Sequence, residues 1–462
     1  MRLPDGPKTL PFLQRLQWIF RPLETLDYRA QKYGDTFRVL GKKLPPLLYF
    51  SSPHALQTIF NADPEQLNSA EGNEILKPLL GEHSLILLDG KRHQRQRQLL
   101  MPPFHGERMR AYGQIICAIT EQVISQWNPG KPFVVRPAMQ EISLRVILSA
   151  VFGLHSGSRA EQLRQLLSSM LDSFSSPLSS TFLFYQFLQR DLGPWSPWGH
   201  FLRQRQQIDQ LLYAEIAERR AQADPDREDI LALLLEARDE AGQPMTDVEL
   251  HDELMTLLFA GHETTASSLA WALYWIGHLP EVRDKLLAEI DSLDPNSDPS
   301  AIVRLPYLTA VCQETLRLYP IALNAFPRIV KQPMELMGYK LEPGTILIAS
   351  IYLAHQREDV YPEPKQFKPE RFLERQFSPY EYLPFGGGNR RCIGLAFAQF
   401  EMKLVLATIL SRLQLALVDQ RPIKPVRRGL TLAPPSHLRM VVTSIRLRHL
   451  QHSIKQTRKA NI

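Results

Sequence analysis

The chain has 462 residues, of which 44% are hydrophobic and 22% charged, and its formal charge at pH 7 is +6. These values indicate a globular protein with a sizeable core and exclude a disordered or collagen-like chain.

Of the 54 basic residues, five lie in an acid-free tail at about 445–462, which leaves 49 basic against 48 acidic residues in the rest of the chain. The five are Arg446, Arg448, Lys455, Arg458 and Lys459. A body this close to neutral excludes a general affinity for nucleic acid. We expect the tail to be a solvated end, with docking to an anionic membrane or an acidic protein as the alternative.

Three cysteines stand far apart, at Cys117, Cys312 and Cys392. An odd number of widely spaced cysteines excludes a disulfide framework. The absence of a Cys-x-x-Cys pair excludes a zinc ribbon. No run of about 18 apolar residues occurs, and the N-terminal residues lack the apolar core of a signal peptide. We therefore expect a cytoplasmic protein without a transmembrane anchor, in which membrane contact is peripheral at most.

No repeat or low-complexity linker divides the chain, which favours one large domain over residues 1–462. Strands are expected at 36–40, 46–50 and 345–352, the first two paired as a hairpin. Helices are expected at 109–127, 204–223, 246–278, 308–319 and 395–413, where apolar residues recur at helical spacing. The fold class is therefore mainly α with a minor β-sheet region.

The longest expected helix, 246–278, has clear signals at both ends. Thr246 and Glu249 form a capping box at its start, and Pro280 lies just past its end. At the α-helical rise it is about 50 Å long, enough to cross a whole domain. Its middle reads Ala-Gly-His-Glu-Thr-Thr over 260–265, and a zinc-protease motif is excluded because Ala266 stands where the second His is needed. An ordinary polar interruption of a core helix remains the alternative.

A glycine-rich loop at 385–394 carries Cys392 between Pro384 and the expected helix 395–413. Backbone N–H groups at a helix start and nearby Arg side chains favour a thiolate over a thiol. Three interpretations stay open for the loop itself: a phosphate-binding loop, a turn with a chance cysteine, or a thiolate ligand to heme iron. The phosphate loop lacks the Gly-Lys-Ser/Thr that usually completes it.

Five residues of this loop, Phe385, Gly388, Arg390, Cys392 and Gly394, fit the Phe-x-x-Gly-x-Arg-x-Cys-x-Gly pattern of the cytochrome P-450 family. The chain therefore resembles a heme-thiolate monooxygenase from about Gly90 to the helix that follows Gly394. The resemblance implies the cytochrome P-450 fold and heme b (iron protoporphyrin IX), with Cys392 as the axial ligand of the iron. Phe385, Gly386 and Arg390 would contact the cofactor.

Two further segments resemble parts of the family. Glu314 and Arg317 lie at spacing i, i+3, which alone indicates only a surface ion pair. By resemblance, they form a buried structural triad with Arg371, from the run Pro369-Glu370-Arg371-Phe372. In the helix 246–278, the family assigns proton delivery to Thr264 and Glu263, with room for dioxygen at Gly261.

The heme propionates have four candidate partners. Arg97 and His93 stand in Gly90–Arg97, where many members of the family have Arg and Trp; an imidazole N–H can still donate to a carboxylate. Arg328 and Arg390 are further candidates by resemblance. A solvated basic helix face is the alternative interpretation of Gly90–Arg97.

The resemblance implies insertion of one oxygen atom from O2 into a lipophilic substrate. Aromatic and apolar residues favour such a substrate, in the segment 182–188, at Trp195 and Trp198, and at Ile321, Ala322, Leu323 and Phe326. A long-chain fatty acid is the first expectation, and a carotenoid or other terpenoid the second. A peroxygenase or hydroperoxide isomerase on the same fold is the alternative activity, and the Glu263–Thr264 pair argues against it.

No fused reductase is expected, since no Rossmann fingerprint is present. A ferredoxin or flavodoxin with an NAD(P)H reductase would then supply electrons to a monomeric enzyme. Its docking face is expected at Arg92, Arg95, Arg391 and Lys403.

Overall fold

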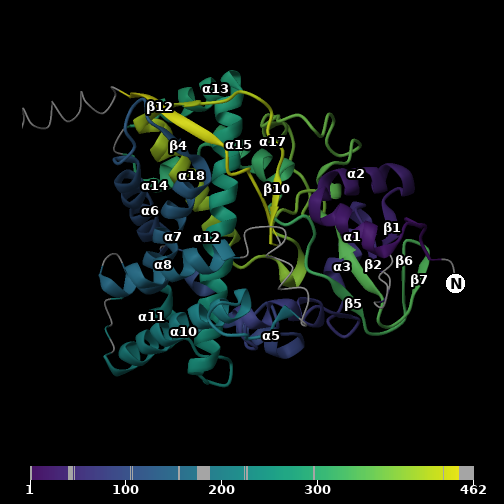
Figure 1. Ribbon diagram of the computed structural model, residues 1–462. Coiled ribbons are helices and arrows are strands. Elements are labelled where there is room, and N and C mark those ends of the chain that lie inside the picture. The colour runs from purple at the N-terminus through teal and green to yellow at the C-terminus, as the bar shows by residue number, and fades with distance from the viewer. Residues whose placement is uncertain are drawn as a thin grey trace, which may run out of the picture.

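The computed structural model describes residues 3–39, 45, 47–104, 106, 108–154, 157–173, 188–222, 224, 227–294, 297–429 and 431–446. A helical part and a smaller part built on a sheet lie side by side (Figure 1). The α-helices are α1 (Pro11–Phe20), α2 (Pro22–Tyr33), α3 (Pro53–Asn61), α4 (Lys77–Leu80), α5 (Gly90–Leu100), α6 (Arg108–Ile124), α7 (Val135–Phe152), α8 (Ser158–Ser173), α10 (Pro197–Ala221), α11 (Ile230–Glu236), α12 (Asp247–His278), α13 (Pro280–Asp291), α14 (Pro299–Ile302), α15 (Pro306–Leu318), α16 (Ile351–His355), α17 (Arg371–Glu374) and α18 (Leu395–Arg412). Short 3-10 helices are η1 (Glu71–Leu76), η2 (Pro102–Phe104) and η4 (Gly388–Arg390).

The strands are short. They are β1 (Thr36–Val39), β2 (Leu47–Phe50), β3 (Leu67–Asn68), β4 (Pro132–Val134), β5 (Arg328–Val330), β6 (Met334–Leu336), β7 (Tyr339–Leu341), β8 (Ile346–Ala349), β9 (Leu413–Leu417), β10 (Val426–Arg428), β11 (Thr431–Ala433) and β12 (Arg439–Ile445). The largest sheet has the order β1-β2-β8-β5-β3. The predicted hairpin is confirmed, because β1 pairs antiparallel with β2 and Thr36 faces Phe50.

One strand prediction is partly wrong. The strand expected at 345–352 ends at Ala349, and Ser350 then caps α16 by accepting a hydrogen bond from the backbone N–H of Leu353. Tyr352 therefore lies in a helix. A serine at the N-cap satisfies a backbone donor that the helix leaves unpaired, and this local bond ends the strand.

The central helix α12 crosses the helical part, as its sequence predicts (Figure 1). Thr246 caps it, and Glu249 completes the capping box. The helix packs against α7, α10, α15 and α18, and its side chains are buried around most of its circumference. Trp271 on α12 is among the largest fully buried side chains. The main hydrophobic core therefore surrounds α12, while two smaller clusters lie around the large sheet.

Among the described helices, none combines the length and apolar character that crossing a bilayer requires. Arg446 at the start of the basic tail belongs to the body, because its guanidinium contacts Asp291 at 2.6 Å and the carbonyl of Leu410 at 2.9 Å. The other four basic residues of the tail lie outside the described residues.

Candidate active site

The cysteine loop folds back on itself just before α18. The backbone N–H of Cys392 donates to the carbonyl of Phe385 at 3.0 Å, and that of Gly386 donates to Leu383 at 2.9 Å. Gly388 has φ +64°, and a Cβ there would lie 2.0 Å from the carbonyl oxygen of Phe60 on α3. No other residue fits this position. The glycine of the motif therefore lets the loop pack directly on the α3 backbone.

Cys392 differs in exposure from the other two cysteines. It is exposed, whereas Cys117 is half-buried and Cys312 is buried. The surrounding protein raises the pKa of the Cys392 thiol by desolvation, and the backbone of Gly394 and the charge of Arg97 act in the opposite direction. An exposed cysteine beside a positive charge and just before a helix suits a thiolate ligand.

A cluster of basic side chains lies next to this loop. Arg97 donates to the carbonyl of Arg391 at 2.8 Å, and Arg390 contacts Asp89 at 2.6 Å. Arg328 is 5% exposed and donates to the carbonyl of Phe326 at 2.8 Å.

Desolvation lowers the pKa of all three guanidinium groups of this cluster, that of Arg328 to about 10. Burial, helped by the charges of Arg390 and Arg97, lowers the pKa of His93 to about 3, so its imidazole is neutral. Among the described residues, Asp89 is the one carboxylate that an ion pair joins to these arginines. Buried charges are normally paired. The surplus of positive charge therefore fits a group with two carboxylates, such as heme.

The middle of α12 opens onto accessible space. Ala260 is exposed and Thr264, one turn later, is half-buried, although the helix is otherwise largely buried. The Thr264 hydroxyl donates to the carbonyl of Ala260 at 2.7 Å. A hydroxyl held in this way presents its lone pairs outward and can also rotate to donate elsewhere. Such a group can pass a proton between two partners.

Gly261 lies where α12 packs closely against α7. A Cβ at this position would lie 3.0 Å from Cδ1 of Ile147 on α7. The glycine therefore permits the close approach of α7 to α12.

Glu263 is held by residues that lie far away in the sequence. Its carboxylate accepts hydrogen bonds from Arg136 at 3.0 and 3.2 Å and from Gln140, both on α7. The guanidinium of Arg428 lies 3.7 Å away. The Glu263 side chain is 13% exposed. Its charge is therefore neutralised by arginines, and no local sequence pattern could have identified these partners.

The structure brings Glu314, Arg317 and Arg371 together in a buried network. Arg317 contacts Glu314 at 2.6 and 2.9 Å, and Arg371 contacts the same carboxylate at 3.1 Å. The side chains of Glu314 and Arg317 are 0% exposed. The guanidinium of Arg317 also donates to the carbonyls of His355 and Pro364, which ties α15 to the end of α16 and to the chain that follows it.

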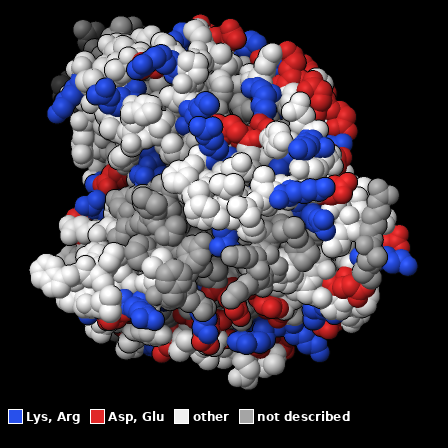
Figure 2. Space-filling model, turned by 45° about the vertical axis from the view of Figure 1, so that its right-hand side comes forward, with Lys and Arg blue, Asp and Glu red and all other residues white. Residues whose placement is uncertain are grey.

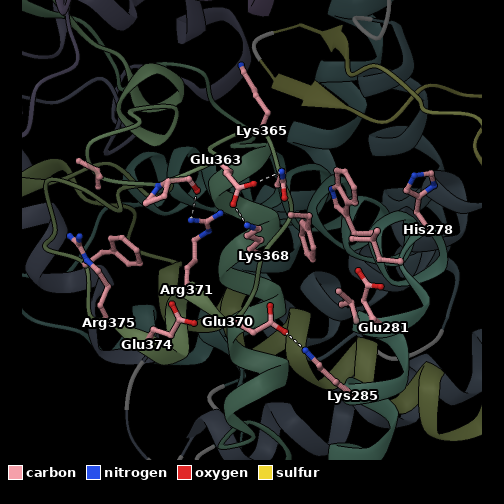
Figure 3. Close-up of a pocket in the computed structure, with 18 residues that line it drawn as sticks. His278, Glu281, Lys285, Glu363, Lys365, Lys368, Glu370, Arg371, Glu374 and Arg375 are labelled. Carbon is pink, nitrogen blue, oxygen red and sulfur yellow. Dashed lines mark hydrogen bonds and ion pairs between the residues drawn. The ribbon is translucent and has the colours of Figure 1, made fainter.

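A cavity of about 930 Å³ lies beside this network (Figure 3). Arg371, Glu370 and Lys368 line it together with residues from the end of α12 and the start of α13. Its wall includes neither the cysteine loop nor Thr264. This cavity is therefore separate from the expected substrate site.

Part of the expected substrate wall lies outside the described residues, namely positions 182–187. Of its two tryptophans, Trp195 is 97% exposed and Trp198 is buried. Leu323 packs into the cluster of Phe37 and Tyr49 near the sheet.

Two residues of the expected docking face have other partners. Arg95 contacts Asp239 at 2.6 Å and Glu249 at 2.9 Å, and Lys403 donates to the carbonyl of Val303 at 3.0 Å. Arg92 and Arg391 are exposed. On the face drawn in Figure 2, basic and acidic side chains are interspersed, in keeping with the nearly neutral body.

Comparison with known proteins identifies the family. The model of the family "Cytochrome P450" matches residues 4–441. The provisionally named cytochrome P450 135B1 of Mycobacterium tuberculosis is 35% identical over 465 residues, covering 96% of this chain and 92% of that protein. Cytochrome P450 135A1 of the same organism, also provisionally named, is 34% identical and covers 95% of both chains.

Comparison with solved structures identifies the same family. A cyanobacterial CYP120A1 with bound retinoic acid has a TM-score of 0.84 and 25% identity, covering 96% of this chain and 100% of that one. The heme domain of cytochrome P450DA has a TM-score of 0.84 at 22% identity, covering 96% and 97%, which shows the fold. The chain therefore belongs to the cytochrome P450 family of monooxygenases, which are oxidoreductases that use heme b.

Proposed function

We propose that this monooxygenase binds heme b through Cys392 and through the basic cluster of Arg97, Arg328 and Arg390. The observation that carries this proposal is the exposed Cys392 beside three arginines, of which only Arg390 is paired with a carboxylate of the described residues, that of Asp89. Arginine suits the propionates because its planar group binds carboxylates with two parallel hydrogen bonds. His93 is neutral and can donate one further N–H.

When bound, heme b supplies the iron chemistry that inserts one oxygen atom of O2 into the substrate. The protein must exclude water and deliver protons. Thr264 can hold a proton at Oγ1, since its hydroxyl both donates and accepts. Glu263, whose carboxylate accepts hydrogen bonds from Arg136 and Gln140, is the candidate link between this hydroxyl and solvent.

A long-chain fatty acid is the substrate that we propose first. A terpenoid is the second candidate, and it is favoured by the retinoic acid that is bound to the similar CYP120A1. The apolar side chains near α12, among them Phe259 and Ile321, support a lipophilic substrate in either case. We further propose a cytoplasmic monomer that receives electrons from a separate ferredoxin or flavodoxin and its NAD(P)H reductase.

The test of the cofactor site is the spectrum of the reduced, carbon-monoxide-bound protein. We expect the red-shifted Soret band of thiolate ligation, its loss in Cys392→Ser, and its retention in the control Cys117→Ser. A band typical of histidine ligation would refute the assignment of Cys392.

The test of the substrate is a titration with fatty acids and terpenoids, followed by the spin-state shift of the iron. Turnover with NADPH, ferredoxin and reductase is then compared with turnover on peroxide alone. Product from peroxide but not from the electron-transfer chain would favour a peroxygenase.

A further inference from the structure

Helix α1 turns its apolar side outward. Leu10 before the helix is 69% exposed, and within it Phe12 is 67%, Leu13 45% and Phe20 60% exposed. The buried residue of α1 is the polar Gln14, which is 3% exposed. An amphipathic helix on a globular protein normally buries its apolar stripe. In α1 the orientation is reversed.

Four apolar residues of α1 form one continuous stripe. At 100° per residue, Phe12, Leu13, Leu16 and Phe20 fall within about 100° of the helix circumference. The stripe is thus as wide as the face that a helix normally buries against a core. Scattered exposed apolar residues need no explanation, but a contiguous patch indicates a contact surface.

The inward side of α1 is fixed to the body by specific contacts. The Gln14 amide donates to the carbonyl of Thr9 at 2.7 Å, which ties the helix to the segment just before it, and the contacts with the body come from Trp18. The ring of Trp18 lies 6.5 Å from that of Tyr49, and the guanidinium of Arg427 lies 5.6 Å from the Trp18 ring. These contacts hold the helix with Phe12 and Phe20 outward. The helix cannot bury its stripe by rolling without losing them.

The charge around the stripe has one sign. Lys8, Arg15 and Arg21 are exposed, and the sequence holds no acidic residue between Asp5 and Glu24. A basic helix with an exposed apolar stripe of Phe and Leu has the composition of helices that lie in the interface of a bilayer. Each basic residue near an anionic membrane surface adds to the attraction.

We propose that α1 is an interfacial helix that docks the enzyme on an anionic lipid surface. A second copy of the chain is a poorer partner, because a two-fold contact between two α1 stripes would bring the same basic residues face to face. In Figure 1, α1 and α2 lie at the end of the molecule opposite α6 and α8, so the helical part would extend away from the surface. A lipid surface also concentrates lipophilic molecules, so docking there would bring the enzyme close to a lipophilic substrate. This benefit rests on the proposed function, whereas the docking itself does not.

The experiment is co-sedimentation of the heme-loaded protein with lipid vesicles. We expect binding to vesicles of phosphatidylcholine with phosphatidylglycerol, weaker binding to phosphatidylcholine alone, and release by high salt. In the double variant Phe12→Ser/Phe20→Ser the partition coefficient should fall by about 100-fold, since each phenyl group contributes roughly a factor of ten in a half-buried position. The variant Lys8→Gln/Arg21→Gln should lose the preference for the anionic vesicles.

The control is Leu373→Ser/Ile445→Ser, which removes two side chains that are 50% and 57% exposed elsewhere on the surface. It should bind as the unchanged protein does. Every variant must keep its carbon-monoxide spectrum, which shows that the fold is intact, and the vesicle measurement requires no catalytic activity. Equal loss in both serine double variants overturns the proposal, as does failure of the unchanged protein to bind anionic vesicles. The stripe would instead be assigned to a second copy by two results together: no binding to vesicles, and a dimer in sedimentation that Phe12→Ser/Phe20→Ser abolishes.

Discussion

Replacing Gly388 by alanine tests whether the cysteine loop depends on direct packing against α3. The residue has φ +64°, and its new Cβ would lie 2.0 Å from the carbonyl oxygen of Phe60. That oxygen belongs to the backbone of α3, so it cannot rotate away as a side chain would. The loop or the helix must therefore move.

The expected cost has two parts. A left-handed backbone costs an alanine about 1–2 kcal/mol relative to glycine. Overpacking a close contact adds roughly 1–3 kcal/mol. Gly338, in the turn between β6 and β7, is a matched control with φ +77° and no atom within 4 Å of its added Cβ. We therefore expect Gly338→Ala to lose about 1–2 kcal/mol of unfolding free energy and Gly388→Ala about 2–5 kcal/mol.

Urea unfolding measures both free energies, and the heme content of the purified variants reports the loop itself. Gly388→Ala should retain less heme than Gly338→Ala at the same expression level. If both variants lose the same stability and retain the same heme, the contact with Phe60 does not determine the shape of the loop, and the steric reasoning fails.

Three further changes have defined outcomes. Thr264→Ala should raise the number of electrons consumed per product, while Thr264→Ser keeps the coupling ratio; equal coupling in both would remove the Thr264 hydroxyl from proton delivery. Glu314→Gln should cost about 3–5 kcal/mol in urea unfolding, because it leaves the buried Arg317 charge without its partner. Burial raises the pKa of Glu401 on α18 to about 8 from 4.5, so between these pH values the folded protein keeps a proton that the unfolded chain releases. The contribution of Glu401 to the unfolding free energy therefore falls by about 1.4 kcal/mol per pH unit as pH rises through that window. Glu401→Gln should flatten the slope of unfolding free energy against pH between pH 5.5 and 7.5.

The elements that could be predicted are those with local signals. The capping box of Thr246 and Glu249, the hairpin at 36–50 and the helix after Cys392 all follow from residues a few positions apart. The bonds that form these elements join residues close together in the sequence, so the sequence alone contains the information that specifies them. These predictions are confirmed. The end of the strand at 345–352 was missed because the N-cap bond of Ser350 competes with the strand, and the residue types alone do not decide between them.

The contacts that could not be predicted join distant parts of the chain. Glu263 is paired with Arg136, which lies 127 positions away, and Arg390 with Asp89, 301 positions away. In both cases the sequence identifies one residue through a motif, while the partner stands in an ordinary helix or, for Asp89, directly before one. When no motif surrounds a charged residue, the sequence does not indicate which oppositely charged residue it will pair with in the folded protein.

Helix α7 connects two features of α12 that the sequence presents as separate. Arg136, Gln140 and Ile147 follow one another at spacings of 4 and 7, which places them on one side of α7. The first two hold Glu263, and the third fills the space that Gly261 leaves. Because the same side of α7 makes all these contacts, the distance between the helices sets how well the acid is paired. Gly261 therefore acts on Glu263 through α7: it permits the close approach that keeps the carboxylate bound to Arg136 and Gln140.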